Sequence, residues 1–132
     1  MNREIKFRGK SICEGQWIFG DLFRTDLDGE VAIQFYDEED GWMTAIVRPE
    51  TVGQFTGVAD INGRQIYEGD IVRVRVSNDR FKKNPRFRNG VVTFCEYDGG
   101  WTNGCYFRFL PQRMEVIGNI HDNPELLEGG QQ

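Results

Sequence analysis

The chain has 132 residues, 39% of them hydrophobic, and a formal net charge of −5. This length is enough to bury a core without a disulfide or metal, and no segment approaches the roughly 20 apolar residues of a membrane span. The acidic balance argues against a nucleic-acid coat protein, and the polar N-terminus carries no apolar leader, so we expect a cytoplasmic location.

The first 56 residues predict a small N-terminal β-sheet lobe, because apolar and polar residues alternate along several short segments. These segments are residues 4–8, 16–24, 31–35 and 42–47. In the first two, Ile5 shares a face with Phe7 and Trp17 shares a face with Phe19, and Ile5, Phe7 and Trp17 are expected to be buried. The acidic residues Asp37–Asp40 form the turn between the last two segments.

Residues 57–127 predict a second β unit, an SH3-like β-barrel, and residues 128–132 a disordered tail. Its five strands are expected near residue 58 and at 71–76, 90–95, 104–110 and 114–118. Alternation places Val72, Val74, Phe94, Phe107 and Val116 in the core. A single helical turn is expected at the end, with Asn123 as N-cap and Pro124 as its first residue.

A glycine-rich motif opens this second unit. In Glu68-Gly69-Asp70-Ile71-Val72, Gly69 is expected to take a positive φ, and Asp70 to accept a hydrogen bond from a nearby backbone N–H. A Gly-Asp entry into a valine-rich strand is also common in small SH3-like barrels, an analogy that does not specify a ligand. The residues assigned to structural motifs are Gly57, Gly63, Gly69, Asp70, Gly118 and Asn119.

Residues 73–88 are strongly basic and contain Phe81 and Phe87. Cations interleaved with aromatic rings suit single-stranded nucleic acid. The same charges could instead be solvated, or could face the acidic turn 37–40 of a neighbouring subunit. The candidate binding residues are Arg73, Arg75, Lys82, Lys83, Arg86 and Arg88.

The titratable residues do not form a recognisable catalytic or metal-binding pattern. His121 is the single histidine, and Cys13, Cys95 and Cys105 lack the spacing of a zinc site or a disulfide framework. We therefore expect no catalytic residue, no metal and no cofactor.

Three blocks of sequence resemble the YopX family of phage and prophage proteins. The first block is Arg3-Glu4-Ile5-Lys6-Phe7-Arg8-Gly9-Lys10, followed by Trp17 and Gly20-Asp21-Leu22. The second runs from Val52 to Val72, and the third covers residues 115–127. The resemblance implies an all-β chain whose C-terminal half is an SH3-like barrel, in the cytoplasm of a bacterial host. It implies no biochemical activity.

We therefore expect a non-catalytic phage- or prophage-encoded binding or assembly protein that forms a homo-oligomer. Seventeen Phe, Trp and Tyr side chains are difficult to bury in two small lobes, and aromatic residues are enriched at subunit contacts. A host or phage protein is a further possible partner. The alternatives are a nucleic-acid-binding barrel that uses residues 73–88 and a small-barrel ribonuclease that draws on Arg64, Glu68 and His121.

Overall fold

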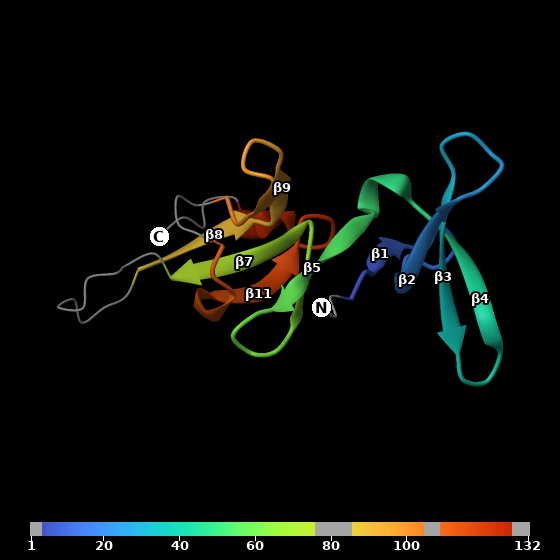
Figure 1. Cartoon of the computed structure of the whole chain (residues 1–132), viewed down its shortest axis with the longest axis horizontal. Coiled ribbons are helices and arrows are strands. Elements are labelled where there is room, and N and C mark those ends of the chain that lie inside the picture. The colour runs from blue at the N-terminus through green and yellow to red at the C-terminus, as the bar shows by residue number, and fades with distance from the viewer. Residues whose placement is uncertain (1–3, 76–85, 105–108, 128–132) are drawn as a thin grey trace. The chain divides into compact units, whose positions relative to one another are not determined.

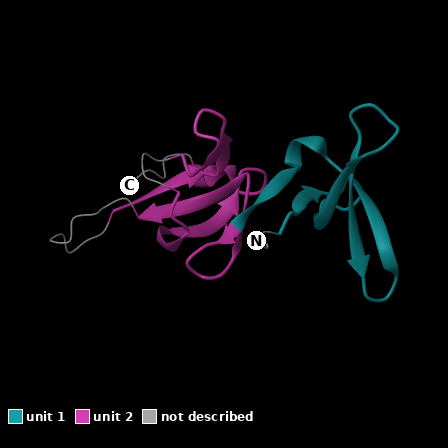
Figure 2. Cartoon of the chain, in the orientation of Figure 1, with its two compact units in different colours: residues 1–57 teal, residues 58–132 magenta. Residues whose placement is uncertain are grey.

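The computed structural model describes residues 4–75, 86–104 and 109–127 (Figure 1). Within these residues the regular elements are β-strands and short 3-10 turns, so the predicted mainly β class is confirmed. The chain divides into two compact units, residues 1–57 and 58–132 (Figure 2); the sequence placed the boundary between residues 56 and 57. No helix among the described residues is long and apolar enough to span a membrane.

Unit 1 is built from consecutive antiparallel strands. They are β1 (Phe7–Lys10), β2 (Trp17–Arg24), β3 (Val31–Asp37), β4 (Gly41–Val47) and, after the 3-10 turn η1 (Pro49–Thr51), β5 (Gly53–Ala59). The spatial order of these strands is β4-β3-β2-β1-β5. The first strand therefore lies in the middle of the sheet, between β2 and β5. The next strand along the chain is the short β6 (Gln65–Tyr67), which belongs to unit 2.

The core of unit 1 centres on β3 and β4. Ala32, Ile33 and Val47 are fully buried, and Val31 lies directly opposite Val47. The prediction that Ile5 points inward is wrong, since its side chain is 67% exposed. Ile5 precedes the first residue of β1, so its position in the alternation is not backed by a paired strand.

Unit 2 contains a three-stranded antiparallel sheet in the order β11-β7-β8 and a separate hairpin of β9 and β10. The strands are β7 (Asp70–Arg75), β8 (Phe87–Val91), β9 (Thr93–Cys95), β10 (Gly100–Thr102) and β11 (Met114–Asn119), with 3-10 turns η2 (Pro111–Arg113) and η3 (Pro124–Leu127). The core cluster consists of Ile66, Val72, Val74, Val92, Met114 and Val116.

The predicted SH3-like barrel is not seen, because no sheet among the described residues closes into a barrel. The chain leaves the strand conformation at Val92, so β9 pairs with β10 and β8 stays at the edge of its sheet. The strand expected at 104–110 falls partly outside the described residues, and Gly104, Phe109 and Leu110 are not in a strand.

The core predictions for unit 2 hold in β7 and β11. Val72, Val74 and Val116 are buried, as predicted. Phe94 is 52% exposed, so its prediction as a core residue is wrong; it lies in the β9–β10 hairpin and packs edge-to-face on Trp101, with ring centroids 5.5 Å apart. Phe107 lies outside the described residues. The closing turn at Pro124 forms as expected. Residues 96–99 form the turn between β9 and β10.

Candidate binding surfaces

Two residues of the basic segment, Arg73 and Arg75, share the outer face of β7. They alternate with the buried Val72 and Val74, and both are exposed, as the sequence predicted. Arg86 is also exposed and precedes β8.

The strand register separates Arg88 from this pair. Arg88 lies directly opposite Val74 on the neighbouring strand, and residues in register share a face of the sheet. Arg88 therefore belongs to the face opposite that of Arg73 and Arg75. Lys82 and Lys83 lie outside the described residues.

Phe87 completes an arginine–aromatic contact on the outer face. It lies opposite Arg75 in the β7–β8 register, and the guanidinium carbon of Arg73 is 4.0 Å from the centroid of its ring. At this distance the cation is attracted to the electron-rich face of the ring, and the planar guanidinium can stack on it. We call Arg73, Arg75 and Phe87 the arginine face.

A cavity of about 430 Å³ opens on this face. Its lining includes Ile61, Arg73, Arg75, Phe87, Gln112, Arg113, Met114 and Glu115. This lining contains three arginines and one glutamate, so its net charge is positive. Glu115 lies opposite Arg73 on β11, and its carboxylate accepts a hydrogen bond from Asn62 Nδ2 at 3.4 Å. Among the described residues, neither Arg73 nor Arg75 forms an ion pair with a carboxylate. The arginine face thus presents cationic groups to a ligand.

The residues predicted as structural motifs lie both in turns and in strands. Gly63 and Gly69 lie in turns and have positive φ values of 84° and 91°. Gly57 has a φ of 94° but lies within β5, and Gly118 lies within β11 next to a shift in the register with β7. Asn119 Oδ1 accepts hydrogen bonds from the backbone N–H groups of His121 and Asp122, both at 2.9 Å. Asn119 therefore shapes the loop that follows β11.

Two of the residues considered for ribonuclease chemistry, Arg64 and His121, form backbone hydrogen bonds within local turns. The backbone N–H of Arg64 donates to Asp60 Oδ1, and that of His121 donates to Asn119. Among the described residues, no group of three or more His, Cys, Asp or Glu side chains could hold a metal ion.

A second surface, which the sequence did not predict, lies on unit 1. Trp17 and Phe19 share a face of β2, as predicted, but this face carries exposed rings: Phe19 is 46% exposed, Tyr36 of β3 is 60% and Trp42 of β4 is 65%. Tyr36 lies opposite Trp42, and their rings meet edge-to-face with centroids 5.4 Å apart. We call Trp17, Phe19, Tyr36 and Trp42 the aromatic face.

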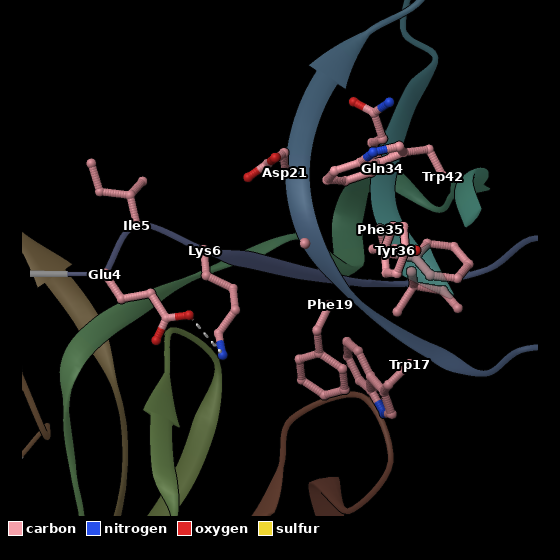
Figure 3. Close-up of a pocket in the computed structure, with 12 residues that line it drawn as sticks. Glu4, Ile5, Lys6, Trp17, Phe19, Asp21, Gln34, Phe35, Tyr36 and Trp42 are labelled. Carbon is pink, nitrogen blue, oxygen red and sulfur yellow. Dashed lines mark ion pairs between the residues drawn. The ribbon is translucent and has the colours of Figure 1, made fainter. Parts of the chain in front are cut away.

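The aromatic face lines a cavity of about 500 Å³, together with polar groups (Figure 3). Asp21 lies opposite Gln34 in the β2–β3 register, and both side chains are exposed. Glu4 also lines the cavity and pairs with Lys6, with 3.5 Å between Oε2 and Nζ. One feature of the sequence points to this surface. Tyr36 and Trp42 lie on either side of the acidic turn, and hairpin pairing brings such positions together.

This geometry defines the class of the protein. It is a small β protein of two units, with an aromatic surface on one unit and an arginine-rich surface on the other. A family model described as YopX protein matches residues 6–128. The chain belongs to the YopX family. No curated protein matches the sequence.

Among solved structures, the chain is similar to protein EF1440 from Enterococcus faecalis, known from a crystal structure. The TM-score is 0.57 at 22% sequence identity, and the match covers 96% of this chain and 100% of that chain. At this identity the similarity shows a shared fold.

Proposed function

We propose that this protein is a non-catalytic binding or assembly protein, encoded by a phage or prophage and acting in the cytoplasm of the bacterial host, and that it self-associates through the aromatic face. The observation that carries the proposal is the exposure of Tyr36 and Trp42, at 60% and 65%, on adjacent strands.

Covering exposed aromatic rings with another protein surface is favourable, because it removes apolar surface from water. Apolar surface removed from water is worth roughly 25 cal/mol per Å², and an aromatic side chain can bury on the order of 150–250 Å². Tyr and Trp are enriched among the residues that dominate binding energy at interfaces. The Tyr36–Trp42 pair, with Phe19 on the same face, therefore supports an interface in which these rings lose water contact.

Sedimentation velocity over a range of protein concentrations tests this proposal. We expect the wild-type chain to associate, and Trp42→Ser to weaken the association at least about tenfold, because an interface hot spot is worth about 2 kcal/mol or more. Tyr97→Ser is the matched control, since Tyr97 is 95% exposed but lies in the β9–β10 turn of unit 2. A wild-type chain that stays monomeric at every concentration would refute the proposal.

The arginine face supports a second candidate function, the binding of single-stranded nucleic acid. Arg73 stacked on Phe87 at 4.0 Å, with Arg75 beside it, combines a cation with an aromatic platform. Fluorescence anisotropy with a labelled oligonucleotide tests it. We expect salt-sensitive binding that is lost in Arg73→Ala/Arg75→Ala and retained in Arg48→Ala, whose exposed arginine lies outside this face. Binding that is the same in all variants would exclude this role.

A further inference from the structure

Among the described residues, cations lie over one end of the aromatic face. On the β1 side, the guanidinium carbon of Arg8 lies 4.7 Å and Lys10 Nζ 5.7 Å from the centroid of the Trp17 ring. At the other end, no described lysine or arginine lies over Tyr36 or Trp42. Within the part of the chain that the structure describes, these two rings on the β3–β4 side therefore carry no cation.

Acidic residues adjoin this end in the sequence. The residues between Tyr36 and Trp42 are Asp37–Asp40 and Gly41, and Asp37 Oδ1 accepts the backbone N–H groups of Glu39 and Asp40 at 2.7 and 3.1 Å. These bonds fix the turn, and Glu38, Glu39 and Asp40 are exposed. The whole of unit 1 carries six basic and eleven acidic residues. An aromatic pair beside several carboxylates is suited to a planar cation.

We propose that the Tyr36–Trp42 end of the aromatic face, together with the acidic turn 37–40, binds the arginine face of a second copy of the chain. Guanidinium groups stack on aromatic rings and bond carboxylates through a fixed fork of N–H donors, so one arginine can use both features of this surface. This inference rests on the proposed function and names the surface that covers the exposed rings.

The charge distribution of the arginine face complements this acceptor. Arg75 makes no described ion pair, Arg73 is held in a stacked geometry on Phe87, and Arg113 adds a third guanidinium to the same cavity. Arginine is well suited to such a contact because its guanidinium is less strongly hydrated than an ammonium group. Each copy offers one donor and one acceptor surface, so the contact is head-to-tail and can extend to rings or filaments.

Paired charge reversals test this contact in the full-length chain. One variant carries Glu38→Lys/Glu39→Lys and the other Arg73→Glu/Arg75→Glu; all four side chains are exposed. Each variant alone has lost one partner of every contact, and we expect sedimentation velocity to show at least about a tenfold weaker association. Mixed in equal amounts, the first variant supplies an intact arginine face and the second an intact acceptor. We expect the mixture to form a heterodimer.

A milder variant and a matched control keep the result interpretable. Arg73→Lys/Arg75→Lys preserves charge but removes the planar fork, so we expect an intermediate loss of association. Glu14→Lys/Asp26→Lys reverses two exposed carboxylates elsewhere in unit 1 and should associate like the wild type. Circular dichroism of every variant checks that the fold is retained.

The possible outcomes separate this inference from the proposal on which it rests. Loss of association in both variants and its recovery in the mixture would support the head-to-tail contact. If both variants associate like the wild type while Trp42→Ser does not, the aromatic face is an interface but the arginine face is not its partner, and the inference fails. A mixture that remains monomeric also overturns the inference. If the wild-type chain is monomeric at every concentration, both the proposed self-association and the head-to-tail contact are wrong.

Discussion

The Asp70 carboxylate accepts a hydrogen bond from the backbone N–H of Tyr67 at 2.8 Å, in a corner where the Asp70 side chain is almost fully buried. The same corner joins further segments through the backbone. Gly69 N–H donates to the carbonyl of Val92 at 2.8 Å, and Ile120 N–H donates to the carbonyl of Gly69 at 3.0 Å. The Gly69-Asp70 pair thus connects β6, β7, the residue between β8 and β9, and the end of β11.

Asp70→Ala is expected to destabilise unit 2. The substitution removes a buried acceptor and the hydrogen bond from Tyr67, which costs about 1–3 kcal/mol in the free energy of unfolding. Urea unfolding followed by circular dichroism measures this cost. Asp26→Ala, at an exposed position of unit 1, is the control and should change the midpoint little. Equal midpoints for the two variants would contradict the role assigned to Asp70.

Gly69→Ala is expected to cost about 1 kcal/mol or more, because a Cβ is strained at positive φ. The structure places φ of Gly69 at +91°, as the sequence predicted. Gly100→Ala is the matched control, since Gly100 lacks a positive φ and a Cβ there meets nothing within 4 Å. Thermal unfolding of both variants compares them. An unchanged melting temperature for Gly69→Ala would remove the argument from backbone strain.

Gly118 and Asn123 are expected to be energetically coupled. A Cβ at Gly118 would lie 2.6 Å from Asn123 Oδ1, the atom that accepts the Asn119 N–H at 3.2 Å. Gly118→Ala should therefore destabilise the wild-type chain more than it destabilises the Asn123→Ala variant, in which the clashing atom is absent. A double-mutant cycle from urea unfolding gives the coupling energy, which for residues in contact is about 0.5–3 kcal/mol. Additive effects would show that no clash occurs.

Met114→Ala is expected to destabilise the chain more than Phe94→Ala, although phenylalanine is the larger side chain. Met114 is 1% exposed in the core of unit 2, so its truncation should cost about 2–5 kcal/mol. Phe94 is 52% exposed and packs mainly on Trp101, so its truncation should cost less. Denaturant unfolding of the two variants decides the order. A larger loss for Phe94→Ala would place it in the core, as the alternation alone had predicted.

The local features of this chain could be predicted from the sequence because short-range geometry decides them. Alternation identified the buried Val72 and Val74 and the outward Arg73 and Arg75, since successive side chains of a strand point to opposite faces. The positive φ at Gly69 and the closing turn at Pro124 follow from the conformational limits of single residues.

Strand pairing decided which candidate residues share a surface. Arg88 seemed part of the basic cluster, but its register opposite Val74 places it on the other face of the sheet. Phe94 continued an apparent alternation with Val92, yet the break at Val92 sends β9 into a separate hairpin, and the predicted barrel does not close within the described part of unit 2. The neighbours of a strand depend on contacts distant in sequence, which periodicity does not specify.

The aromatic face shows this division most clearly. Trp17 and Phe19 could be placed on one side of β2 without a structure, because successive side chains of a strand alternate between its two faces. The exposure of this side, the addition of Tyr36 and Trp42 from β3 and β4, and the burial of Ile33 and Val47 depend on strand pairing and packing. Alternation defines the two faces of a sheet, whereas the packing of the chain determines which face is covered.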